Sequence, residues 1–290
     1  MAVEPRSSTQ EEPRRIERIA HEQFVKYVQK MSLRAALRHP AGLLLAALFA
    51  LSGCRSMATP VQSPPVDVSS VATRRALWLD PSHAEWPREA PAVSRLRFET
   101  TKGVFVLELH RAWGPLGVDR LYNLARLGYY DDTRFHRVNA RYIAQWGLHG
   151  DSAVNAAWKG RYLTDDPPRS RNTRGTFAFS YEGPGKPNTR NTQLYVNLAD
   201  NARNDDEPFT ILGTVIEGMA VLDSLYSGYG ENSGSGVRQG RQGPLERGGN
   251  AFMDREYPRL DRITRVTVSV PKRSRGQRSS ETPSSPPWLP

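Results

Sequence analysis

Residues 93–270 contain many short runs of strand-forming residues separated by turn residues. These runs predict strands at 133–138, 142–145, 176–181, 193–197 and 209–215, a hairpin within 95–110 and a last strand in 263–270. Helical spacing occurs in two stretches, 115–128, which ends at Gly128, and 219–226. Many short strands with two helices favour a closed, mainly antiparallel β-barrel over a parallel α/β sheet.

The composition changes along the 290 residues, and the changes mark the ends of the folded part. Residues 1–40, 55–92 and 271–290 are polar, charged or rich in proline. We expect a flexible tether and irregular arm over 55–92, one folded domain over 93–270 and a disordered basic tail over 271–290. The two tails, 1–40 and 271–290, carry +6 of the formal net charge of +10, and such charge usually serves solvation or attraction to a membrane surface. The glycine-rich stretch 238–249 reads as a mobile loop without aromatic residues among its arginines, so no nucleic-acid partner is expected.

The single cysteine, Cys54, ends a segment with the pattern of an export signal. Basic Arg34 and Arg38 precede an apolar run over 41–51, which is too short to span a bilayer, and the sequence LSGC follows. This ending is similar to a bacterial lipobox, whose cysteine is acylated. We therefore expect a lipoprotein signal peptide over 31–54; the alternative is a short buried helix with a free cysteine. Residues 1–30 would then be a gene-model artefact ahead of a true start at Met31, or a cytoplasmic extension.

The stretch FHRVNARYIAQWG places Arg137 and Gln145 among apolar residues on two predicted strands. Alone, such an arginine would most simply pair with a carboxylate at the rim of the sheet. Further motifs follow in order: GTFAFS at 175–180, NTRNTQLYVNL at 188–198 and FTILGTVIEGMAVLDSL at 209–225. Together they resemble the cyclophilin family of peptidyl-prolyl isomerases, from about Phe98 to Leu225 and more loosely to Val270.

The resemblance implies an eight-stranded antiparallel barrel, capped by two α-helices, with a shallow groove on its outer surface. It implies that Arg137 is the catalytic residue and that Gln145 supports it. It also assigns eight residues to substrate binding: Phe135, Tyr142, Ile143, Ser180, Tyr181, Gln193, Tyr195 and Phe209.

The chemistry of this site needs one directed hydrogen bond. A guanidinium N–H aimed at the prolyl nitrogen can bond the twisted amide and not the planar one, so neither base nor cofactor is required. His110, His136 and His149 lack metal-ligand spacing, and no metal is expected. The departures from the family include Tyr142 and Tyr195, which stand where phenylalanines are usual, and the missing tryptophan at the groove edge. We expect both tyrosine hydroxyls to turn outward, since burying an unpaired hydroxyl costs ~1–3 kcal/mol.

The expected function is that of a monomeric, lipid-anchored isomerase in the bacterial cell envelope, on the periplasmic side of the inner or outer membrane. Its expected partners are proline-containing unfolded or exported polypeptides and the lipid bilayer. The alternative is a non-catalytic cyclophilin-like module that binds proline-containing segments, as a chaperone or as part of an envelope assembly.

Overall fold

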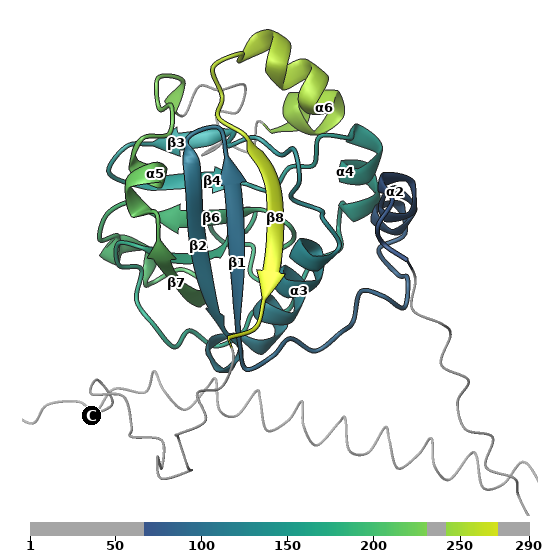
Figure 1. Cartoon of the computed structure of the whole chain (residues 1–290). Helices are drawn as coiled ribbons and strands as arrows, with labels where there is room; N and C mark the ends of the chain where they lie inside the picture. The colour runs from purple at the N-terminus through teal and green to yellow at the C-terminus, as the bar shows by residue number, and fades with distance from the viewer. Residues whose placement is uncertain (1–66, 231–241, 272–290) are drawn as a thin grey trace, which may run out of the picture. The chain divides into compact units, whose positions relative to one another are not determined.

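The computed structural model describes residues 67–230 and 242–271, and within them eight strands form one antiparallel sheet (Figure 1). The predicted signal peptide, Cys54 and the predicted tail from residue 272 lie outside the described residues. The strands are β1 (Val93–Thr100), β2 (Gly103–His110), β3 (Arg137–Asn139), β4 (Ile143–Trp146), β5 (Thr176–Phe179), β6 (Leu194–Asn197), β7 (Ile211–Glu217) and β8 (Ile263–Ser269). The prediction of eight short antiparallel strands is confirmed.

The sheet is curled but open, so the prediction of a closed barrel is wrong. Its strand order is β3-β4-β6-β5-β7-β2-β1-β8, which leaves β3 and β8 at the edges. These edges meet only where an isolated bridge joins Arg134 to Arg262, just before each strand begins. Because β3 has three residues and pairs with β4, while β8 pairs with β1, no ladder continues between the two edges.

The β1–β2 hairpin forms one wall of the main core. The two-residue turn pairs Thr100 with Gly103, whose φ of 126° lies where a side chain would be strained. Alternation along the two strands then buries Phe98 and Phe105, whose rings stack with centroids 4.7 Å apart. Trp146 of β4 packs edge-on against both rings, so the hairpin and the far strands share one interior.

Two of the helices were predicted, and three were not. The helices in the described residues are α2 (Val71–Leu79), α3 (Pro115–Arg126), α4 (Ser152–Trp158), α5 (Met219–Asp223) and α6 (Gly243–Glu256), with 3₁₀ turns η1 (Arg111–Trp113) and η2 (Ala202–Asn204). α3 and α5 confirm the two helical patterns. α3 ends as expected, with Gly128 at a φ of 70° and a hydrogen bond from Tyr129 N to Leu124 O.

The arm before β1 is partly helical, which corrects the expectation of an irregular segment. Helix α2 buries Leu77 and Trp78, and the Trp78 Nε1–H donates to the Leu127 carbonyl oxygen at 2.9 Å. Ser70 caps the helix by accepting from the Thr73 N–H. The sequence did not reveal this helix, because it buries only Leu77 and Trp78, too few positions to give a helical pattern, and Trp86 lies beyond its end.

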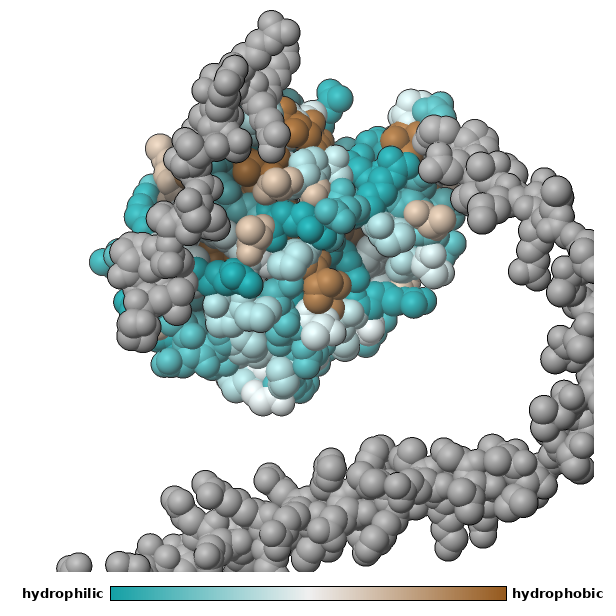
Figure 2. Space-filling model, turned by 90° about the horizontal axis from the view of Figure 1, so that it is seen from below, coloured by the Kyte–Doolittle hydropathy of each residue, from teal (hydrophilic) through white to brown (hydrophobic). Residues whose placement is uncertain are grey.

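The face seen in Figure 2 is mostly hydrophilic, with small separate apolar patches between the hydrophilic residues. The exposed large apolar residues of the described chain are likewise scattered: Val71, Leu79, Leu116, Tyr162, Ile216 and Val270. Among the described helices, none is both long enough and apolar enough to cross a bilayer.

Candidate active site

Strand alternation creates a second face of the sheet, opposite the main core. Along β4, Ala144 and Trp146 enter the main core while Ile143 and Gln145 point the other way. Cross-strand pairing aligns the outward side chains into one row over five strands, in the order Arg137, Gln145, Tyr195, Ala178 and Ile211. Directly opposed residues lie close enough to interact, so this row runs from a cationic end to an apolar end.

The cationic end is held by hydrogen bonds between side chains. Arg137 is 8% exposed, and its Nη1 donates to Gln145 Oε1 at 3.1 Å. Gln145 in turn donates from Nε2 to Gln193 Oε1 at 2.8 Å. The guanidinium carbon also lies 5.7 Å from the centre of the Tyr142 ring, within reach of a cation–π interaction. These contacts fix the plane of the guanidinium at the start of β3.

The apolar end is a small cluster separate from the main core. Ile143, Ala178, Tyr195 and Ile211 are buried in it, and Trp113, Tyr142 and Phe209 pack at its margin. The Phe209 ring meets the Tyr195 ring edge-on with centroids 5.1 Å apart. The cluster can hold a small apolar ring beside the Arg137 guanidinium.

The two tyrosine hydroxyls do not turn outward, which corrects the sequence-based expectation. The Tyr195 hydroxyl is buried and donates to Asn172 Oδ1 at 2.7 Å. The Tyr142 hydroxyl donates to Asn204 Oδ1 at 3.1 Å. Burial, with a smaller contribution from Tyr142, raises the pKa of Tyr195 well above its usual range, so this phenol remains a donor. The polar cost expected for buried hydroxyls is therefore offset by partners from distant loops.

Arg203 and Glu207, which sequence reasoning missed, line the same cavity as Arg137. Arg203 of η2 stacks on the Tyr142 ring, with its guanidinium carbon 4.0 Å from the ring centre. It lies in the stretch 202–208, which contains no tryptophan, and it lines this cavity. The sequence contained no signal for this contact, because Arg203 and Tyr142 lie about 60 residues apart in the chain. Tyr181 donates to Glu207 of the same stretch, and burial together with this bond raises the pKa of Tyr181.

Nine of the ten predicted site residues line one cavity of about 770 Å³: Arg137, Tyr142, Ile143, Gln145, Ser180, Tyr181, Gln193, Tyr195 and Phe209. The tenth, Phe135, is a correction. It lies in the main core with its ring 5.4 Å from the ring of Trp146. Its backbone N–H bonds the Asp261 carbonyl oxygen before β3 begins, so strand alternation does not carry it to the face of Arg137.

His136 and His149 are buried near the site, and the His136 ring hydrogen-bonds the Gln193 side chain. Burial, and to a lesser extent the Arg137 charge, lowers the pKa of His136 to about 3. Burial lowers the pKa of His149 to about 4, and its ring lies 4.7 Å from Trp78 and 5.0 Å from Tyr129. The described residues contain no group of three or more acidic, histidine or cysteine side chains placed to hold a metal ion.

This arrangement places a fixed N–H donor beside an apolar pocket. Such a site can bind an apolar ring in the pocket and donate a hydrogen bond to an atom beside that ring. It needs no covalent step to do so. The geometry fits catalysis by electrostatic stabilisation of a twisted bond.

Comparisons with known proteins agree with this chemistry. The family model described as "Cyclophilin type peptidyl-prolyl cis-trans isomerase/CLD" matches residues 95–242. A peptidyl-prolyl cis-trans isomerase of Acinetobacter baylyi is 26% identical over 140 residues, which are 47% of this chain and 73% of the relative. A peptidyl-prolyl cis-trans isomerase-like 1 protein of Gibberella zeae is 32% identical over 130 residues, covering 44% of this chain and 78% of the relative.

A solved structure was also found to be similar. The crystal structure of a Cryptosporidium parvum cyclophilin type peptidyl-prolyl cis-trans isomerase is 20% identical, with a TM-score of 0.45. The match covers 62% of this chain and 99% of that one.

Proposed function

Because this chain belongs to the cyclophilin-type peptidyl-prolyl cis-trans isomerases, we propose that it accelerates X–Pro isomerisation in exported polypeptides at the surface of a bacterial membrane, to which acylated Cys54 anchors it. Membership of the family supports the isomerase activity. The pattern of residues 31–54 supports the anchor and the compartment.

The reaction is a rotation about a partial double bond. Uncatalysed rotation of the peptide bond costs ~18–20 kcal/mol because it breaks amide resonance. In the twisted state the prolyl nitrogen regains a lone pair, which the planar amide lacks. An N–H of Arg137 directed at that nitrogen bonds the transition state and not the ground state, and this difference lowers the barrier.

One hydrogen bond does not account for the whole acceleration. Isomerisation takes tens of seconds unaided, and bringing it to milliseconds needs about 10⁴-fold, or roughly 5.5 kcal/mol. A hydrogen bond to a charged group contributes about 1.5–3 kcal/mol. The remainder is assigned to the apolar cluster of Ile143, Tyr195 and Phe209, which holds the proline ring away from water while the rest of the peptide turns.

The observation that carries the catalytic part is the Arg137–Gln145 hydrogen bond beside that cluster. The test is an isomerase assay of the full chain in detergent on a short proline peptide, with Arg137→Ala beside it. We expect catalysis by the wild type and a large loss in the variant. A folded wild type without activity would instead favour the non-catalytic module that binds proline-containing segments.

The anchoring part has a separate test. Labelled fatty acid fed to expressing bacteria should enter the wild type, and Cys54→Ser should abolish the label and release the protein from membranes. Unchanged labelling of the variant would exclude Cys54 as the lipid site. We further propose that the protein is a monomer, which light scattering after size-exclusion chromatography measures directly.

A further inference from the structure

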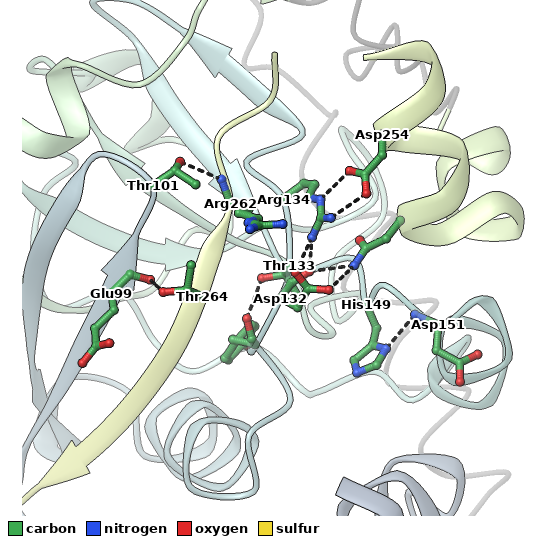
Figure 3. A network of polar contacts seen from close by, with 12 residues as sticks. Glu99, Thr101, Asp132, Thr133, Arg134, His149, Asp151, Asp254, Arg262 and Thr264 are labelled. Carbon is green, nitrogen blue, oxygen red and sulfur yellow. Dashed lines mark hydrogen bonds and ion pairs between the residues drawn. The ribbon is translucent and has the colours of Figure 1, made fainter. Parts of the chain in front are cut away.

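Helix α6 contacts the segment that leads into β3 and Arg137. Figure 3 shows Arg134, three residues before Arg137, between Asp132 and Asp254 of α6. The Arg134 guanidinium donates to Asp254 through Nε at 2.9 Å and through Nη2 at 2.8 Å. A bidentate pair of this kind fixes orientation as well as distance.

A close backbone approach completes the docking. The Asn250 N–H donates to the Gly150 carbonyl oxygen at 2.9 Å. Gly249 permits this contact, because its φ of 56° and ψ of −153° break the helix and a Cβ there would lie 2.1 Å from that oxygen. Leu245 and Met253 bury their side chains against Leu148. The helix is therefore held at several points along its length.

This docking brings Gln242, the N-cap residue of α6, to the cavity. Gln193 Nε2 donates to Gln242 Oε1 at 2.5 Å. Three amides thus form one chain of hydrogen bonds that ends on the guanidinium: Gln242 accepts from Gln193, Gln193 accepts from Gln145, and Gln145 accepts from Arg137.

We infer that Gln242 is a positioning residue for the catalytic arginine, acting through this chain of amides. A glutamine amide has an acceptor at one end and a donor at the other, and it can present either end by flipping. Gln145 supports Arg137 only while its oxygen faces the guanidinium. That orientation requires Gln193 to present its oxygen to Gln145, and therefore its NH₂ group to a further acceptor. Gln242 Oε1 accepts from that NH₂ group, and the buried His136 ring also hydrogen-bonds the Gln193 side chain.

A purely structural role explains the side chain less well. Gln242 is the N-cap of α6, but its side chain makes no capping hydrogen bond. Removing the amide should therefore leave the helix intact, which separates an effect on the site from an effect on folding. The inference rests on the isomerase activity, but the order of the variants tests it separately.

The experiment compares four full-length proteins in the isomerase assay: wild type, Gln242→Glu, Gln242→Ala and Gln242→Lys. Glutamate keeps an acceptor and should stay within about two-fold of wild type. Alanine removes the acceptor and should lower kcat about 3- to 10-fold, the range for one neutral hydrogen bond, with KM little changed. Lysine offers donors only, draws the Gln193 oxygen toward itself and should fall below alanine.

A control variant and an NMR measurement test whether the effect acts through the amide chain. Glu256→Ala, at the exposed end of the same helix, is the control and should match wild type. The NMR signals of the Gln145 side-chain NH₂ group should move toward those of a free amide in Gln242→Ala and remain in place in Gln242→Glu. An inactive wild type would refute the function itself. An active wild type with all Gln242 variants equal, or with glutamate falling as far as alanine, would overturn the inference.

Discussion

Replacing Arg137 by lysine separates a directed hydrogen bond from positive charge. Arg137 donates to Gln145 through one N–H of a planar group that carries five, so a second N–H can address the substrate while the first holds the plane. Lysine keeps the charge as a compact, strongly hydrated ammonium on a flexible stem. A lysine therefore cannot bond Gln145 and direct a hydrogen bond to the prolyl nitrogen at the same time.

The expected loss follows from the one bond made only in the transition state. That bond is worth about 1.5–3 kcal/mol, so kcat/KM of Arg137→Lys should fall roughly 10- to 200-fold, nearly as far as Arg137→Ala. Gln145→Ala should fall less, because Gln145 orients the guanidinium and does not touch the twisting bond.

The neighbouring Arg203 sharpens this prediction. Its guanidinium carbon lies 4.0 Å from the centre of the same Tyr142 ring that Arg137 approaches at 5.7 Å. A positive field therefore persists at the groove in every Arg137 variant. If a diffuse field sufficed, even Arg137→Ala would lose little activity.

The measurement is kcat/KM on a short proline peptide, with thermal melts to confirm folding. Arg141→Lys is the matched control, because Arg141 is exposed on the turn after β3 and the same chemical change there should cost nothing. A folded Arg137→Lys protein within about three-fold of wild type would refute the directed bond.

Three further predictions concern stability. Tyr195→Phe removes one buried hydrogen bond and should cost about 0.5–1.5 kcal/mol in urea unfolding while activity persists; a loss above about 3 kcal/mol would show that the hydroxyl holds the whole loop network. The pKa values of His136 (about 3) and His149 (about 4) are lowered in the folded protein, so below about pH 6.5 the unfolded chain binds more protons. The free energy of unfolding should therefore fall as the pH drops below about 6.5, by up to ~1.4 kcal/mol per histidine at one unit below that pH. Equal urea midpoints at pH 7 and 5 would contradict this. Gly249→Ala should cost ~1–3 kcal/mol because of its backbone conformation and the nearby carbonyl, whereas Gly243→Ala, which meets only the flexible end of Arg247, should leave Tm nearly unchanged.

The alternation of side chains between the two faces of a strand made most of the site predictable. Once β4 is placed, Gln145 must share a face with Ile143 and oppose Trp146, and the same rule puts Tyr195 on the outer face of β6. The rule failed at Phe135 because the chain there pairs with residue 261 instead of continuing β3. The local sequence around residue 135 does not indicate that its backbone pairs with residue 261.

Contacts between distant segments could not be predicted in this way. The hydroxyl of Tyr195 finds Asn172 across a loop, and asparagine there reads only as a turn residue. Helix α6 was hidden for a related reason. Its glycines each cost about 1 kcal/mol of helix propensity, so residues 243–249 read as a loop. Burial of Leu245 and Met253 outweighs that cost, and burial depends on the fold around them.

The open edge of the sheet and helix α6 are two parts of one arrangement. In a closed barrel, β8 would pair along β3 and hold it from outside. Here that ladder is limited to the bridge between Arg134 and Arg262. Asp254 holds the Arg134 side chain just before β3, and Gln242 ends the amide chain that reaches Arg137. Helix α6 thus holds the segment just before the edge strand by a side-chain pair, at the end where a closed barrel would have a ladder. Variants that loosen α6, such as Gly249→Ala, should therefore lower kcat as well as stability.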